Sequence, residues 1–177
     1  RASNAGPTAD VNLFDLTADQ LVDLLGSQNQ WFADRARVQL ASRADRRVAP
    51  RLRTMATQAD NIDLALEGLW GLQAVGALDR QTTLSLLKHP SEQLRRWAIR
   101  LACDDGRLPT GVLRELVRLA TNDASLLVRR QLALSARRLP AASARQFLLP
   151  LLSRDLDNDD PRMPLLLWWA IEEGAEE

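Results

Sequence analysis

Apolar residues recur along this chain with helical spacing in five segments that lie about thirty residues apart. The segments span 29–43, 60–76, 89–105, 122–138 and 158–174, and their first residues are separated by 31, 29, 33 and 36 positions. Residues 94–98 and 128–132 correspond through a shift of 34 positions. A repeat of this length indicates helical hairpins that stack to share one core. We therefore expect an all-α fold, an α-solenoid of about five helical hairpins.

Capping residues predict where individual helices begin. Thr17 and Gln20 form a capping box ahead of a short first helix, which Gly26 ends. The predicted N-caps of later helices are Asn29, Asp79, Ser91, Thr110 and Asp123. The fifth hairpin is expected at about 141–152 and 163–173. Inward-facing positions at helical spacing include Trp31, Ala36, Leu40, Leu94, Trp97, Leu101, Val128, Leu132 and Ala136.

The length and composition fit one globular domain. The chain has 177 residues, of which 46% are hydrophobic, enough for a continuous core. We expect a linker or remnant at 1–9 and a single helical domain over 10–177. No apolar run of membrane-spanning length occurs, and the first ten residues lack the apolar core of a signal peptide. Because the sequence starts without methionine, we expect a processed product or a piece of a longer protein.

The last predicted helix is apolar on nearly all sides, since it contains the run Pro-Leu-Leu-Leu-Trp-Trp-Ala-Ile at 164–171. A terminal repeat normally shows a polar outer face, so we expect a further repeat or domain to cover this one. The alternative is that Trp168 and Trp169, about 100° apart on a helix, pack on two inner neighbours. The candidate interaction residues are Arg95, Arg96, Arg129, Arg130, Trp168 and Trp169. Their alternative role is pairing between repeats and core packing.

Few residues suggest catalysis or metal binding. His89 precedes Pro90 at the start of a helix and is expected to serve the turn, and Cys103 is expected in the core. Asp155, Asp157 and Asp159 have the first spacings of a calcium loop, but the loop's glycine and bidentate glutamate positions hold Asp160 and Leu166. We expect these carboxylates to complement the start of the final helix. The sequence therefore predicts no catalytic residue, no cofactor site and no metal site.

Several segments of the sequence resemble a known family. They are 24–43 (LLGSQNQWFADRARVQLASR), 69–79 (LWGLQAVGALD), 128–136 (VRRQLALSA) and 164–172 (PLLLWWAIE). They look like the HEAT-repeat region of planctomycete-type membrane-bound dehydrogenase-domain proteins. The resemblance implies HEAT-like hairpins between a sugar-dehydrogenase-like β-propeller and a c-type haem domain, in a periplasmic or extracytoplasmic protein. The haem-attachment sequence Cys-x-x-Cys-His is absent from this chain, so its expected role is that of a spacer.

A nucleic-acid alternative rests on the arginines of segment 35–53. These are Arg35, Arg37, Arg43, Arg46, Arg47, Arg51 and Arg53. HEAT-like alkylpurine DNA glycosylases use a basic face, and Trp31 with Asp34 could supply the aromatic group and the carboxylate. Against this alternative, 23 basic residues balance 23 acidic ones to a net charge of zero. A third alternative, a lyase or chaperone acting on a protein-bound pigment, lacks an identifiable acid or base.

The favoured hypothesis is a non-catalytic HEAT-repeat scaffold that binds adjacent domains of its parent protein or another protein. It predicts no small-molecule substrate and places nucleic acid second among possible partner classes. Many unrelated functions share helical-repeat architecture, so the sequence does not identify the partner.

Overall fold

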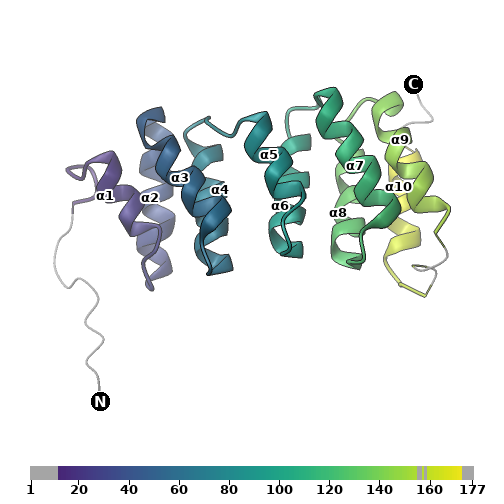
Figure 1. Ribbon diagram of the computed structural model, residues 1–177, viewed down its shortest axis with the longest axis horizontal. Helices are drawn as coiled ribbons and strands as arrows, with labels where there is room; N and C mark the ends of the chain where they lie inside the picture. Colours follow the sequence, from purple (N-terminus) through teal and green to yellow (C-terminus); the bar gives the residue numbers. More distant parts are fainter. Residues whose placement is uncertain (1–11, 155–156, 158, 173–177) are drawn as a thin grey trace, which may run out of the picture. The chain divides into compact units, whose positions relative to one another are not determined.

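The computed structural model consists of helices packed in antiparallel pairs (Figure 1). It describes residues 12–154, 157 and 159–172. These residues form α-helices, one 3-10 helix and connecting turns, which confirms the predicted all-α fold. The linker predicted at 1–9 lies outside the described residues. The chain divides into two compact units, Arg1–Leu78 and Asp79–Glu177.

The N-terminal unit contains two hairpins. Its helices are α1 (Ala18–Leu24), α2 (Gln30–Arg43), the 3-10 helix η1 (Arg46–Val48), α3 (Ala49–Gln58) and α4 (Ile62–Ala74). The helix α2 packs on α1 and α4, and α3 packs on α4. Pro50 lies in the first turn of α3, where its missing N–H costs no hydrogen bond.

The C-terminal unit contains three hairpins. Its helices are α5 (Arg80–Leu87), α6 (Glu92–Cys103), α7 (Thr110–Asn122), α8 (Leu126–Ala136), α9 (Ala141–Leu152) and α10 (Met163–Glu172). The odd-numbered helices α5, α7 and α9 pack in sequence, and so do the even-numbered helices α6, α8 and α10. Within this unit the packing therefore follows the predicted solenoid pattern.

Several predicted helix starts are confirmed. The Thr17 N–H donates to Gln20 Oε1 at 2.8 Å and the Gln20 N–H donates to Thr17 Oγ1 at 3.3 Å, which completes the capping box. Asn29 accepts from the Trp31 N–H at 3.1 Å, and Asp79 accepts from the Thr82 N–H at 2.7 Å. Short polar side chains at these positions satisfy backbone donors that the helix leaves unpaired.

Two predicted caps, Thr110 and Asp123, are wrong, and a third, Ser91, is confirmed in position only. Ser91 occupies an N-cap position but makes no side-chain capping bond, and Thr110 is the first residue of α7 rather than its cap. The cap of α8 is Ser125, whose Oγ accepts from the Val128 N–H at 3.3 Å. Asp123 instead accepts from the Ser125 N–H at 2.9 Å and turns its carboxylate toward Arg95. A local capping rule does not detect this competing long-range partner.

The core follows most of the predicted apolar stripe. The fully or nearly fully buried residues include Ala36, Leu40, Leu52, Leu69, Leu94, Cys103, Leu116, Val128, Leu132 and Phe147. Trp31 is an exception, because 53% of its surface is exposed although its spacing predicted a core position. It lies on the outer side of α2, and its ring meets Phe32 edge to face with centroids 5.0 Å apart. Trp97 and Leu101 are also only partly buried.

Gly68 allows a close contact between α3 and α4 in the N-terminal unit. A Cβ atom at Gly68 would lie 2.6 Å from the backbone nitrogen of Ala56 and 2.9 Å from the carbonyl oxygen of Leu52. Backbone atoms cannot rotate away as side chains can, so a larger residue would push α3 and α4 apart. Glycine at this position therefore sets the spacing of the two helices.

We expect Gly68→Ala to destabilise the protein by about 1–3 kcal/mol, because overpacking outweighs the roughly 1 kcal/mol gain in helix propensity. Urea unfolding followed by circular dichroism measures this change. Gly111→Ala in α7 is the matched control, since the nearest atom there is the mobile guanidinium of Arg80. Equal stability of the two variants would contradict the proposed tight contact.

Candidate interaction surfaces

Arg95 joins two consecutive hairpins of the C-terminal unit. Its Nε and Nη2 donate to the two carboxylate oxygens of Asp123 at 2.8 and 3.0 Å. Its Nη1 donates to the carbonyl oxygens of His89 and Pro90 at 2.8 and 2.7 Å. The guanidinium thus connects the loop before α6 to the loop before α8, with the paired geometry that suits a planar fork.

Arg129 makes the same connection one repeat later. Its Nε donates to Asp157 Oδ2 at 2.7 Å, and its Nη1 donates to the carbonyl oxygen of Asp123 at 2.8 Å. Both side chains of this pair are about 95% buried, since 6% and 5% of their surfaces are exposed. The hydrogen bond from Arg129 to Asp157 raises the pKa of the arginine. Together Arg95, Asp123, Arg129 and Asp157 form an ion-pair ladder through three consecutive hairpins.

Arg130 also contacts the following repeat. It pairs with Asp160, whose carboxylate accepts from the Met163 N–H at 2.7 Å and so caps α10. The bond from Arg130 lowers the pKa of Asp160. Among the described residues, Arg96 has no such ion pair. The structure therefore places Arg95, Arg129 and Arg130 in pairing between repeats, the alternative role that the sequence suggested for them.

Trp168 and Trp169 lie on α10 and face two different hollows. Trp168, 64% exposed, lines a hollow with residues of α9 and α10 that include Leu152, Met163 and Ile171. Trp169, 42% exposed, lines a separate groove with residues of α8. The adjacent tryptophans point apart because successive helical residues differ by about 100°. Neither is packed away in the core.

The arginines of segment 35–53 are largely engaged within the N-terminal unit. Arg37 pairs with Asp34 and Glu67 and lies over the Trp70 ring at 5.1 Å, and Arg51 pairs with Asp23. Glu67 is a buried charge that the sequence analysis missed. Two charged partners of Arg37 leave it poorly placed to contact phosphate.

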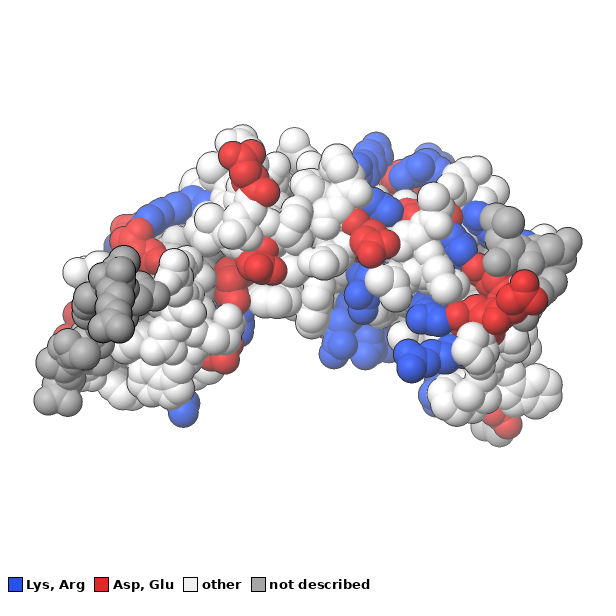
Figure 2. All heavy atoms as spheres, turned by 90° about the horizontal axis from the view of Figure 1, so that it is seen from below, with Lys and Arg blue, Asp and Glu red and all other residues white. Residues whose placement is uncertain are grey.

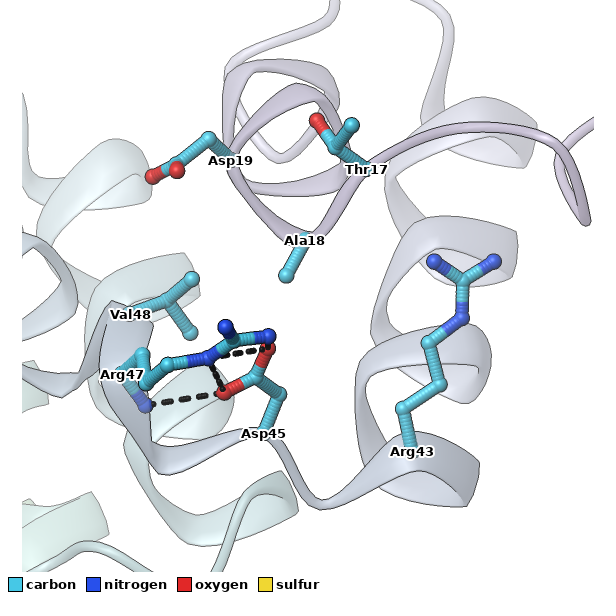
Figure 3. Close-up of a pocket in the computed structure, with 7 residues that line it drawn as sticks. All are labelled: Thr17, Ala18, Asp19, Arg43, Asp45, Arg47 and Val48. Atoms are coloured by element: carbon cyan, nitrogen blue, oxygen red, sulfur yellow. Dashed lines mark hydrogen bonds and ion pairs between the residues drawn. The ribbon is translucent and has the colours of Figure 1, made fainter.

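A hollow of about 790 Å³ in the N-terminal unit contains two more of these arginines (Figure 3). Arg47 folds onto Asp45 with Nε–Oδ1 and Nη2–Oδ2 distances of 2.9 and 2.7 Å, which lowers the Asp45 pKa to about 2. Arg43 donates to the carbonyl oxygens of Leu13, Phe14 and Leu16. These bonds hold the segment before α1 against the end of α2.

Trp31 and Asp34, the residues proposed for a glycosylase site, do not form an isolated acid beside an aromatic pocket. The Asp34 carboxylate lies against Arg37, and the Arg35 guanidinium lies 5.7 Å from the centroid of the Trp31 ring. A general base needs a free lone pair directed at its substrate, whereas here the carboxylate accepts from a guanidinium. This geometry gives the nucleic-acid alternative no specific support.

His89 and Cys103 occupy the positions predicted for them. His89 Nδ1 accepts from the Ser91 N–H at 3.0 Å, which orders the turn before α6, and burial lowers its pKa. Cys103 is fully buried, and burial raises its thiol pKa to about 12. A thiol with this pKa stays protonated at neutral pH and is a poor nucleophile.

The aspartates before α10 serve structural roles where the structure describes them. Asp157 binds Arg129 and Asp160 caps α10, while Asp159 is exposed and Asp155 lies outside the described residues. Among the described acidic residues of this loop, Asp160 therefore caps the start of the final helix. In the described part of the chain, no three histidine, cysteine or acidic side chains are grouped to hold a metal ion.

Comparison of the chain with protein-family models, curated proteins and solved structures finds no match. Within the described residues, every helix is too short or too polar to cross a membrane.

We expect Asp157→Ala to reduce stability by about 3–5 kcal/mol, because it leaves the buried Arg129 charge without its carboxylate. Chemical denaturation compares this variant with Asp159→Ala, a substitution of an exposed aspartate in the same loop. Adding Arg129→Met to Asp157→Ala should recover part of the loss, since the unpaired charge is then removed. A similar stability for Asp157→Ala and Asp159→Ala would show that the ladder contributes little.

Proposed function

We propose that this chain is a non-catalytic helical-repeat scaffold that binds protein partners. The observation that carries the proposal is an exposed apolar surface on the last hairpin. We call this the end surface, and it consists of Leu149, Leu152, Trp168 and Ile171. Each is at least 43% exposed, whereas no large apolar residue of α6 or α7 is exposed. Contiguous apolar surface of this kind is typical of interaction sites.

The shape of the end surface supports docking of a helical element. The closest packing of α10 is on α8, and two hollows of about 290 and 300 Å³ are lined by residues of both α9 and α10. Ile171 and Leu152 line both hollows. Apolar side chains of a partner could fill them, with Trp168 as an anchor of the kind that often dominates binding energy.

The ion-pair ladder indicates what kind of contact this would be. Arg95 and Arg129 each bind a carboxylate of the following repeat, but the position 34 residues after Arg129 holds the buried Met163. A hairpin stacked on α9 and α10 would therefore receive no arginine from this position. The proposed contact rests on apolar burial, as in stable interfaces between domains.

The family resemblance makes the proposal more specific. It suggests that the partner is a neighbouring domain of an exported redox protein, with a dehydrogenase-like β-propeller on one side and a c-type haem domain on the other. The buried Cys103 and the turn-ordering His89 leave this chain without an evident group for redox chemistry of its own. In this proposal the repeats hold the two domains at a fixed separation.

A photo-reactive residue at position 168 tests the end surface directly. In the full protein, expressed in its native host, we expect it to cross-link to a segment outside residues 1–177 or to one defined partner. The same residue at position 114, an exposed arginine of α7, is the control. Trp168→Lys should weaken the association by roughly 2 kcal/mol or more while leaving the melting temperature nearly unchanged. Equal cross-linking at both positions would refute the end surface as a docking site.

The spacer proposal is tested by the complete reading frame and its product. We expect a Cys-x-x-Cys-His sequence beyond this chain and covalently bound haem, detected by peroxidase staining after denaturing electrophoresis. A complete native product without covalent haem would remove the spacer proposal, although the end surface would still require a partner. Steeply salt-dependent binding to double-stranded DNA would instead favour the nucleic-acid alternative.

A further inference from the structure

The groove beside Trp169 is a second surface, chemically different from the end surface. It has a volume of about 390 Å³ and lies between α8 and α10. We call it the α8–α10 groove. It is lined by Leu134, Arg137, Arg138, Leu166 and Trp169. None of them lines the hollows of the end surface. Its apolar part is open to solvent, because Leu134 and Trp169 are 46% and 42% exposed.

Two arginines at the end of α8, Arg137 and Arg138, line this groove. Arg138 lies 3.4 Å from Asp104, and both side chains are exposed, at 40% and 36%. Arg100 lies one turn before Asp104 on α6, with its guanidinium 5.2 Å from the centroid of the Trp97 ring. Figure 2 shows Lys and Arg side chains gathered on one edge of the C-terminal unit. The surface thus combines positive charge with exposed apolar groups.

The ion pair between Arg138 and Asp104 differs from the buried ladder. Exposed pairs contribute little to stability, and water or another carboxylate can replace either partner at small cost. Arg129 and Arg95, by contrast, are held by buried or nearly buried carboxylates. Arg138 can therefore exchange Asp104 for a carboxylate of a ligand. Arg95 and Arg129 cannot, because their ion pairs hold successive hairpins together.

We propose that the α8–α10 groove binds an acidic segment of a partner protein, in which carboxylates flank an apolar side chain. The apolar side chain contacts Leu134, Leu166 and Trp169. One carboxylate takes the place of Asp104 on Arg138. This recognition goes beyond the apolar docking at the end surface, because it uses charge to select the partner.

The observations favour an acidic peptide over a nucleic acid. Asp104 at the rim would repel phosphates held beside Arg138, and every nucleotide carries such a charge. Two leucines in the groove suit an aliphatic side chain, whereas single-stranded nucleic acids bind through stacking on several aromatic rings. A peptide brings only one carboxylate beside Asp104, where it replaces that group on Arg138, and can keep the adjoining positions neutral.

The test uses a fluorescein-labelled peptide that repeats Glu-Glu-Leu-Leu, with fluorescence anisotropy on the whole chain. A matched peptide carries Gln in place of every Glu. We expect the acidic peptide to bind at least about tenfold more tightly than the Gln peptide, with affinity falling as salt is added. Arg138→Glu and Trp169→Ser should each weaken binding of the acidic peptide about tenfold or more. Arg114→Glu on α7 should change it less than about twofold.

Asp104→Asn provides a variant that gains binding. It removes the carboxylate that competes for Arg138, so we expect affinity for the acidic peptide to rise by about threefold or more. This result could not arise from misfolding, and circular dichroism confirms that each variant keeps its helices. Trp168→Lys should leave peptide affinity unchanged, so failure of the end-surface proposal and failure of this one can be told apart.

Equal affinities for the Glu and Gln peptides would overturn the proposal, as would unchanged binding by Arg138→Glu. A labelled oligothymidine that binds more tightly than the acidic peptide, and is lost in Arg138→Glu, would assign the surface to nucleic acid instead. Weakened binding by Asp104→Asn would also contradict the exchange of carboxylates on Arg138.

Discussion

The C-terminal unit depends on buried arginine–carboxylate pairs that connect each hairpin to the next. Arg95 and Arg129 each use one side of the guanidinium for a carboxylate in the loop that precedes the next even-numbered helix, and the other side for a carbonyl in the loop that precedes their own helix. Because each charge is fully paired, its burial is tolerated, and removal of one partner would leave the other desolvated. The pairs therefore fix the register in which apolar faces of successive hairpins meet.

The end of the ladder separates the two proposed surfaces. At Met163 the arginine is replaced by a buried apolar residue, and the end surface beyond it is apolar. The α8–α10 groove includes Arg138, whose ion pair with Asp104 is exposed and exchangeable. In these two proposals one helix presents Trp168 to an apolar partner and Trp169 to an acidic one. Positions that are one residue apart on a helix can serve separate partners in this way, since they project in different directions.

Rules that use neighbouring residues correctly predicted the helix features that neighbouring residues determine. The capping box of Thr17 and Gln20, the Asn29 cap and the bounds of α9 depend on residues within one helical turn. The rules failed at Asp123, which resembles a cap but binds Arg95 from 28 positions away. The shift of 34 residues that relates Arg95 to Arg129 also relates Asp123 to Asp157. That second correspondence was the available signal for the ladder.

The sequence by itself determined the helices, their repeat and most of the core, because helical periodicity and capping are encoded in residues close along the chain. Only the tertiary structure decided that Trp31 is exposed, that Glu67 is buried beside Arg37, and that Trp168 and Trp169 face different hollows. An amphipathic pattern gives the direction of a side chain relative to its own helix axis. Which neighbour meets that direction is set by how the hairpins pack, and this depends on close contacts such as Gly68 against α3.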